Sequence, residues 1–220
     1  MAPPSNRLRT AILISGRGSN MQALIESCRA ADAPAEIALV LSNEPDAAGL
    51  SLAAAAGIAT RVVSHRAFAD RAKFEAEIDS VLRAAGIQLT CLAGFMRILS
   101  DKFVEDWRDR MINIHPSLLP AFKGLNTHAR ALAAGARIHG CTVHFVRPEM
   151  DSGPIVVQAG VAVEPGDTPD TLAARVLQAE HRIYPLALRW IAEGRVRVQE
   201  ERVLIDGVSA PLAPLLNPQP

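Results

Sequence analysis

Short apolar runs alternate with amphipathic stretches along the first half of this chain. Leu8 to Ser15 is an apolar run, and behind it Met21, Leu24 and Cys28 recur at the spacing of a helix. The same alternation predicts strands at residues 37–41, 61–63 and 89–93, and helices at residues 47–56 and 68–85. Strands that alternate with helices in this way predict βαβ units and a parallel sheet.

The pattern changes after a further strand expected at residues 111–114. Two strand-like runs, Cys141–Val146 and Ile155–Val163, have no helical pattern between them. They predict an antiparallel or mixed extension of the sheet. The fold class expected from the pattern is therefore α/β, with a mostly parallel sheet and this extension towards the C-terminus.

The last quarter of the chain begins with a long helical pattern. A helix is expected over Thr168–Ala192, with a kink or break at Pro185, because proline lacks the backbone N–H. Residues 195–198 and 202–205 predict a small hairpin. Residues 207–220, which are rich in proline, are expected to form a loose tail.

Length and charge narrow the class of protein. The 220 residues suit one domain over 1–220, with halves at about 8–100 and 101–206. The 23 basic and 23 acidic side chains cancel, which argues against nucleic acid or an anionic membrane as partner. No apolar run could cross a bilayer and no signal-peptide pattern opens the chain. Three scattered cysteines, Cys28, Cys91 and Cys141, indicate buried free thiols, so a cytoplasmic protein is expected.

The loop Gly16–Asn20 lies between the first strand and the first helix. Ser19 or Asn20 would cap that helix, and its free N–H groups and dipole favour a bound phosphate. The loop is not a dinucleotide fingerprint, because Met21 stands where the third glycine would fall, and no P-loop lysine follows. A tight turn and a phosphate site are both compatible with this pattern.

Asn113 and His115 form the most informative polar pair of the chain. They are two residues apart on an expected strand, so their side chains share one face, and Pro116 ends the strand. The carboxyl ends of strands are where open α/β sheets place their chemistry. Asp151, in the turn between the two later strands, could reach the same edge and hold the imidazole as an imidazolium. A hydrogen-bonded structural histidine and a turn-forming aspartate are the simpler interpretations.

Two further segments have an open interpretation. The apolar loop Gly94–Leu99 follows the strand at 89–93 and could form the wall of an apolar cleft or pack into the core. Glu180 and His181, within the long helix, could face solvent or a ligand. Metal binding is not expected, because His139, Cys141 and His144 lack ligand spacing and His144 would face away from the other two.

Taken in order, these segments resemble the phosphoribosylglycinamide formyltransferases, a folate-dependent family of purine biosynthesis. The resemblance runs from about Leu8 to beyond Gly194. It is carried by the stretches Ser15–Asn20, Gly94–Leu99, Asn113–Pro120, Phe122–Gly124, His139–Val146, Asp151–Ile155 and Gln178–Pro185. The fold that it implies is Rossmann-like, a mostly parallel sheet with helices on both faces and a mixed C-terminal extension.

The resemblance implies roles for residues that match the family's motifs. Asn113, His115 and Asp151 would be the catalytic set. Gly18, Ser19 and Asn20 would hold the phosphate of the ribonucleotide, and Glu180 its ribose. The implied folate site consists of Arg71, Met96, Arg97, Ile98, Leu99, Asn113, Arg147, Pro148, Glu149, Met150 and Asp151.

The implied reaction moves the formyl group of 10-formyltetrahydrofolate, a co-substrate, to the amine of glycinamide ribonucleotide. Asn113 and His115 would stabilise charge on the formyl oxygen, with Asp151 paired to the imidazolium. Small-molecule substrates are expected as partners, without metal, nucleic acid or membrane, in a monomer or homodimer.

Three alternatives stay open. A formyltetrahydrofolate hydrolase would use water in place of the amine, but such relatives carry an additional N-terminal domain. A formyltransferase acting on initiator tRNA would carry a C-terminal domain and a basic surface. A non-catalytic nucleotide-binding module would use the glycine loop and leave His115 with a structural role.

Overall fold

The computed structural model describes residues 7–209 and 216–218. The chain divides into two compact units. The first is Met1–Asn113 with Val146–Pro148, and the second is Ile114–Phe145 with Glu149–Pro220. A single domain over 1–220 stays a prediction, and each unit has its own secondary structure.

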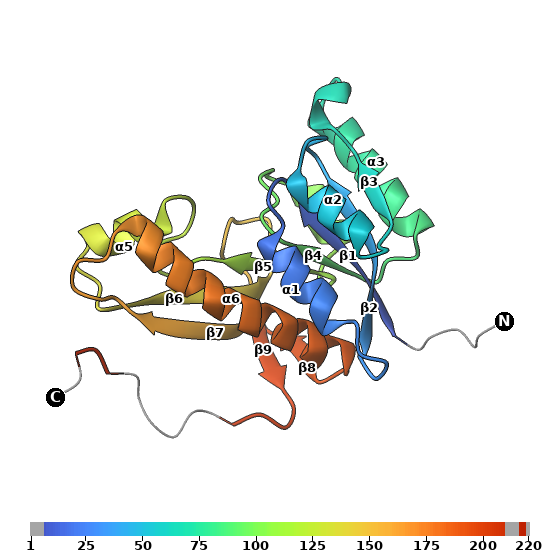
Figure 1. Ribbon diagram of the computed structural model, residues 1–220. Helices are drawn as coiled ribbons and strands as arrows, with labels where there is room; N and C mark the ends of the chain where they lie inside the picture. Colours follow the sequence, from blue (N-terminus) through green and yellow to red (C-terminus); the bar gives the residue numbers. More distant parts are fainter. Residues whose placement is uncertain (1–6, 210–215, 219–220) are drawn as a thin grey trace. The chain divides into compact units, whose positions relative to one another are not determined.

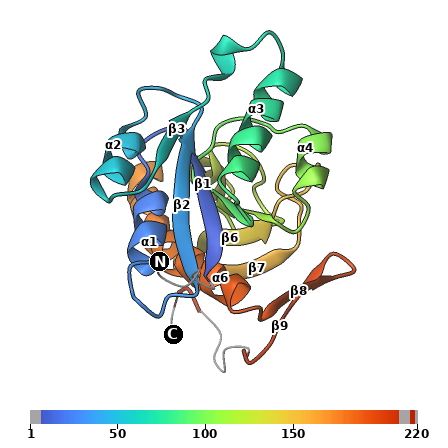
Figure 2. The same ribbon diagram turned by 90° about the vertical axis from the view of Figure 1, so that its right-hand side faces the viewer.

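The first unit is built on parallel strands. Its strands are β1 (Leu8–Ile14), β2 (Ala35–Ser42), β3 (Thr60–Val62), β4 (Leu89–Leu92) and the start of β5 (Met111–His115) (Figure 1). Its helices are α1 (Ser19–Ser27), α2 (Ala48–Ala55), the 3-10 helix η1 (His65–Ala67), α3 (Arg71–Ala84) and α4 (Asp101–Asp106). β1 pairs in parallel with β2 and β4, β2 with β3, and β4 with β5, which confirms the predicted parallel sheet. Figure 2 shows α1 and α2 on one side of β1 and β2, and α3 on the other.

The apolar face of α3 holds this helix on the sheet. Phe74, Ile78 and Leu82 recur at helical spacing and are buried in one cluster with Leu13 and Leu41 of the strands. Burial of a side chain of this size contributes about 1.5–3 kcal/mol. The loops at the carboxyl ends of β1, β2 and β4 are therefore carried by a rigid scaffold.

The second unit combines an antiparallel pair with a long helix. Its elements are the end of β5, α5 (Thr127–Ala133), β6 (Ile138–Phe145), β7 (Ile155–Ala162), α6 (Pro169–Ala192), β8 (Val196–Gln199) and β9 (Arg202–Ile205). β6 pairs with β7 and β8 with β9 in antiparallel fashion, so the predicted extension and hairpin are confirmed. The strands follow the order β3-β2-β1-β4-β5-β6-β7, with β8 and β9 as a separate sheet.

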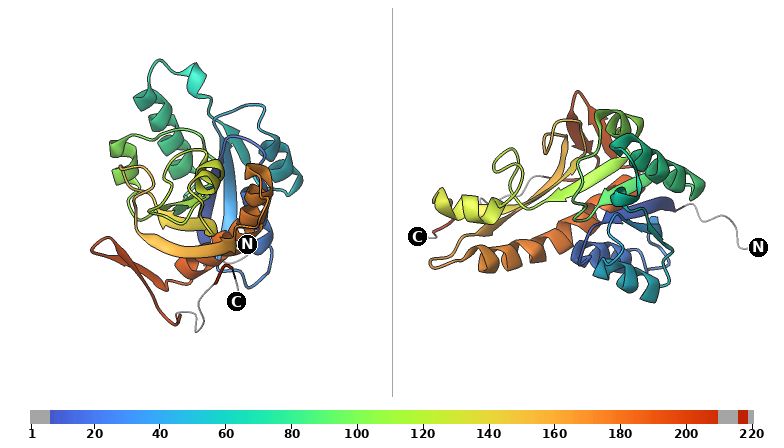
Figure 3. Two further views of the ribbon diagram at one scale, coloured as in Figure 1. Left: turned by 90° about the vertical axis from the view of Figure 1, so that its left-hand side faces the viewer. Right: turned by 90° about the horizontal axis from the view of Figure 1, so that it is seen from above.

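Helix α6 corrects one expectation. Of the kink or break expected at Pro185, the break does not occur, because a single helix extends over Pro169–Ala192 with the proline inside it. The kink stays a prediction. Pro185 removes one backbone hydrogen bond, but Ile183, Tyr184 and Leu188 on both sides of it are buried and hold the helix together. Figure 3 shows α6 as one helix that lies along β6 and β7.

Other expectations about helices were also wrong. Gly18, rather than Ser19 or Asn20, is the N-cap of α1, and it has no side chain to donate or accept. Helix α3 begins at Arg71 and not at residue 68, because the carboxylate of Asp70 accepts from the N–H of Lys73 and caps it. The short helices α4 and α5 were not predicted at all.

The expected loose tail lies partly outside the described residues, at 210–215 and 219–220. Within it, Asn217 is bonded: its side-chain amide donates to the carbonyl oxygen of Val163 at 3.0 Å and also to that of Arg137. This part of the tail is therefore attached to the ends of β6 and β7. Among the described residues, no helix combines the length and apolar character that a membrane span requires.

Candidate functional site

Strand β5 carries the polar pair predicted from the sequence. It ends at His115, directly before Pro116. Asn113 is the last residue of the first unit, and His115 belongs to the second. Strand alternation places both side chains on one face of β5. Asn113 is half-buried, whereas His115 is 6% exposed.

The imidazole of His115 lies between two hydrogen-bond acceptors. Its Nδ1 is 3.4 Å from Oδ2 of Asp151, and its Nε2 is 3.1 Å from the carbonyl oxygen of Phe122. A carboxylate and a carbonyl can only accept, so both contacts are favourable together only when both ring nitrogens carry a proton. Asp151 and the carbonyl oxygen of Phe122 therefore fix the orientation of the His115 ring.

The carboxylate of Asp151 is held in place from the backbone. Its Oδ2 accepts from the N–H of Gly124 at 2.8 Å, and its side chain is 11% exposed. Asp151 itself has a φ of 52°, in the left-handed region that aspartate tolerates better than most residues. A buried, hydrogen-bonded carboxylate beside a histidine can orient the ring and stabilise its charge.

His144 also faces Asp151, and sequence reasoning did not identify it. Its Nε2 lies 3.9 Å from Oδ1 of Asp151, and its Nδ1 is 3.0 Å from the carbonyl oxygen of Phe145. Burial lowers the pKa of His144 to about 4, so the ring is neutral near pH 7.

Two further histidines of the second unit, His128 and His139, interact electrostatically with His115. His139 lies edge-on to the rings of Phe122 and His128, with centroid distances of 5.9 and 5.3 Å. Burial lowers the pKa of His139 to about 4. In the described ranges 7–209 and 216–218, no group of three His, Cys, Asp or Glu side chains could hold a metal ion.

The glycine loop of the first unit opens helix α1. Gly18 has a φ of 78°, and a Cβ there would lie 3.0 Å from the Cα of Gly49 and from Cε of Met21. The N–H of Gly49 donates to the carbonyl oxygen of Gly16 at 3.0 Å, which fixes the loop. The first N–H groups of α1 have no partner within the helix, so this end can bind an anion.

The apolar loop after β4 is divided between surface and core. Met96 and Ile98 are 68% and 73% exposed, whereas Leu99 is buried in the cluster that contains Phe74. The exposed pair fits a wall for an apolar ligand, and the side chain of Leu99 has the packing role that the sequence left open. Arg71, the first residue of α3, has a 56% exposed side chain.

The residues of the loop before Asp151 differ in burial and in their partners. The guanidinium of Arg147 is buried and donates to Oδ1 of Asp109 at 2.7 Å, so it forms a structural ion pair. Glu149 pairs with Lys123 at 3.0 Å, and this hydrogen bond lowers the pKa of Glu149. Met150 is 55% exposed.

Glu180 lies on α6 and is buried with 7% exposure. Burial and the nearby Glu180 carboxylate raise the pKa of the Cys141 thiol to about 12, which keeps this cysteine protonated and unreactive. A buried carboxylate on a helix needs polar partners. This requirement is compatible with a ligand-binding role and with a structural role.

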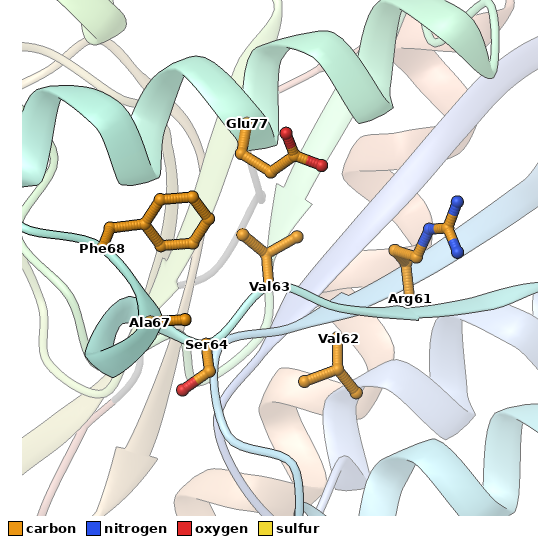
Figure 4. Close-up of a pocket in the computed structure, with 7 residues that line it drawn as sticks. All are labelled: Arg61, Val62, Val63, Ser64, Ala67, Phe68 and Glu77. Carbon is orange, nitrogen blue, oxygen red and sulfur yellow. The ribbon is translucent and has the colours of Figure 1, made fainter.

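A pocket of about 380 Å³ lies elsewhere in the first unit, where β3, η1 and α3 meet (Figure 4). It is lined by Arg61, Val62, Val63, Ser64, Ala67, Phe68 and Glu77. None of these residues was predicted from the sequence to bind substrate or to act in catalysis.

Comparisons with known proteins point in one direction. The family model described as formyl transferase matches residues 8–188. The phosphoribosylglycinamide formyltransferase of Haemophilus influenzae is 42% identical to this chain, over 95% of this chain and 99% of its own length. That of Escherichia coli is 44% identical, over 91% of this chain and 94% of its own length. The chain is also 51% identical to the human trifunctional purine biosynthetic protein adenosine-3 over 88% of its residues, but it spans only about a fifth of that protein's length.

Solved structures agree with these matches. A glycinamide ribonucleotide transformylase from Symbiobacterium toebii has a TM-score of 0.89 and 43% identity, with 93% of this chain and 97% of that chain covered. A formyltetrahydrofolate deformylase from Burkholderia mallei has a TM-score of 0.82 and 30% identity, with 90% and 70% covered. The predicted α/β fold is confirmed.

Proposed function

Because this chain belongs to the formyl transferase family, we propose that it transfers the formyl group of 10-formyltetrahydrofolate to the amine of N1-(5-phospho-D-ribosyl)glycinamide. The products are the N-formylated ribonucleotide and tetrahydrofolate, in de novo purine biosynthesis. The observation that carries the proposal is the His115 ring, with Asp151 at one nitrogen and a carbonyl at the other.

In the proposed reaction the substrate amine attacks the formyl carbon, and a C–N bond forms while negative charge develops on the formyl oxygen. The side-chain amide of Asn113 donates to this oxyanion, and the Nε2–H of His115 donates to it in place of the carbonyl oxygen of Phe122. Each such donor contributes about 3–4 kcal/mol in other enzymes. Asp151 faces Nδ1 of His115 and keeps the ring oriented.

The tetrahedral intermediate then breaks its bond to the folate nitrogen. The attacking amine loses one proton and the departing nitrogen gains one, so the protons balance without an external acid or base. His115 and Asp151 supply groups through which this proton can travel. No covalent intermediate with the protein is needed.

Substrate binding is assigned to the elements that the sequence singled out. The N-terminus of α1 with Gly18, Ser19 and Asn20 takes the phosphate, because its N–H groups and dipole favour an anion. Glu180 takes the ribose. For the folate, the exposed side chains of Met96 and Ile98 offer an apolar surface, and Arg71 offers a positive charge. The other residues proposed to line the folate site are Arg97, Leu99 and residues 147–151. The protein is further proposed to be a cytoplasmic monomer or homodimer with small-molecule partners.

One assay tests the function directly. Purified protein is mixed with glycinamide ribonucleotide and 10-formyltetrahydrofolate, and tetrahydrofolate formation is followed by absorbance while the formylated ribonucleotide is identified by mass. Tetrahydrofolate that appears only with the ribonucleotide supports the transferase.

The structural similarity to the deformylase makes hydrolysis the second candidate. Formate released at the same rate without the ribonucleotide would assign the chain to that reaction. Binding of both ligands without any turnover would favour a non-catalytic module.

A further inference from the structure

Glu75 is a buried carboxylate that contacts Arg71 of the proposed folate site and Ser100, which directly follows the proposed folate residues Met96–Leu99. It lies on α3 with 5% exposure. One of its oxygens accepts from the N–H of Ser100 at 2.7 Å, and the other accepts from the hydroxyl of Ser100. Burial of a carboxylate is unfavourable unless hydrogen-bond donors replace the water that it loses. The two donors of Ser100 supply this replacement for Glu75.

This contact fixes one end of the segment Gly94–Ser100. Near the other end, the hydroxyl of Ser15 accepts from the N–H of Met96 at 2.7 Å and donates to the side chain of Asn43. Leu99 is anchored in the core between these points, whereas Met96 and Ile98 stay exposed. An exposed apolar surface held at both ends is preorganised for a ligand and loses little entropy on binding.

Glu75 also lies one helical turn after Arg71. The Nε of Arg71 is 4.0 Å from Oε1 of Glu75, the oxygen that accepts from the N–H of Ser100. A single carboxylate thus contacts both Arg71 and the loop that presents Met96 and Ile98. Opposite charges at this i,i+4 spacing restrict the directions of the exposed guanidinium.

We infer that Glu75 is a positioning residue for folate binding, which holds the 94–100 segment and orients Arg71 without contacting the substrate itself. This inference rests on the assignment of the folate site given above. The alternative is a purely structural role, in which Glu75 stabilises the start of α4. Ser100 is the N-cap of that helix, and its hydroxyl accepts from the N–H of Phe103 at 3.2 Å, a bond that does not itself involve Glu75.

The test compares Glu75→Ala, Glu75→Gln and the control Glu77→Gln, an exposed glutamate on the same helix. Glu75→Ala is expected to raise the KM for 10-formyltetrahydrofolate roughly tenfold, with kcat and the KM for the ribonucleotide within about twofold of wild type. Glu75→Gln still accepts from the N–H of Ser100 but lacks the charge near Arg71, so a rise of about threefold is expected. The control should match wild type.

Two further variants separate this inference from the site assignment. Arg71→Ala and Ile98→Asp act on the proposed folate site itself and should each raise the folate KM. If they do and the Glu75 variants do not, the positioning role is wrong while the site stands. If Glu75→Ala raises both KM values equally, its role is structural. If Arg71→Ala and Ile98→Asp have no effect, the site assignment fails and the inference fails with it.

Discussion

At His115, the two acceptors around the ring determine what a substitution should do. In His115→Ala the ring N–H that the proposal assigns to the developing oxyanion is lost, so kcat is expected to fall at least about a hundredfold. Ribonucleotide affinity should change less than about twofold, because the proposed phosphate and ribose contacts lie on other elements. The measurements are steady-state kinetics and calorimetric binding of the ribonucleotide.

His115→Asn is the matched variant, since its amide keeps an N–H donor without a positive charge. It should retain more activity than His115→Ala. Turnover of either variant at the wild-type rate would contradict the proposed role of the His115 ring.

Asp151 offers a test of the carboxylate beside His115. Asp151→Asn can still accept from the N–H of Gly124, but it removes the negative charge 3.4 Å from His115. Since a neutral amide then replaces the carboxylate that faces Nδ1 of His115, kcat should fall at least about tenfold, while the KM for the ribonucleotide should stay within about twofold of wild type. Glu164→Gln, which removes an exposed charge in the same unit, is the control. A wild-type kcat in Asp151→Asn would argue against this role of the carboxylate.

The proximity of Asp151 to His115 was predicted from the sequence, whereas the contacts of His144 with Asp151 and of Glu75 with Ser100 were not, for a physical reason. His115 and Asp151 lie at the end of a strand and in a turn, and both features can be recognised from the sequence pattern alone. His144 reaches Asp151 beside a register shift between Val143 and His144, and Glu75 meets Ser100 across 25 residues of sequence. Contacts of this kind depend on packing that no local pattern encodes.

At the scale of elements, the start of α1 depends on the backbone of Gly18. In Gly18→Ala, the positive φ and the close approach to Gly49 should destabilise the protein by about 1–3 kcal/mol. Since the same turn directs the N–H groups of α1, the KM for the ribonucleotide should also rise. Urea unfolding and kinetics measure the two effects.

Gly16→Ala provides the comparison, because a Cβ there meets no atom within 4 Å and the backbone is not in the left-handed region. Its stability should stay within about 0.5 kcal/mol of wild type. Equal stability of the two variants would show that the turn does not need glycine at position 18.

The elements themselves were predictable where periodicity or alternation continued long enough. The predicted bounds agree with the structure within about one or two residues for β1, β2, β4 and β7, which is the usual uncertainty of element ends. The antiparallel extension of the sheet was also predicted. Helices α4 and α5 were missed because six and seven residues give too few turns for a periodic signal. The break expected at Pro185 does not occur because tertiary packing compensates for one lost hydrogen bond.

At the scale of the whole molecule, buried neutral histidines should make stability depend on pH. Burial lowers the pKa of His139 and of His144 from 6.5 to about 4. At a pH between about 4 and 6.5, each of these histidines is protonated in the unfolded chain and neutral in the folded chain. The free energy of unfolding should therefore be highest above pH 6.5 and fall as the pH drops towards 4, by at most about 3 kcal/mol per histidine.

His139→Phe tests this dependence without altering the groups around Asp151, since a phenyl ring can keep the edge-on contacts with Phe122 and His128. In urea unfolding, the slope of stability against pH between about 5 and 6 should decrease by roughly 1 kcal/mol per pH unit relative to wild type. Above pH 7 the difference between the two proteins should be constant, which serves as an internal control. Asp167 does not interfere: the hydrogen bond from Arg175 lowers its pKa from 3.8, so its contribution is lost only at more acidic pH. An unchanged slope in His139→Phe would mean that His139 takes up its proton equally in the folded and unfolded chains.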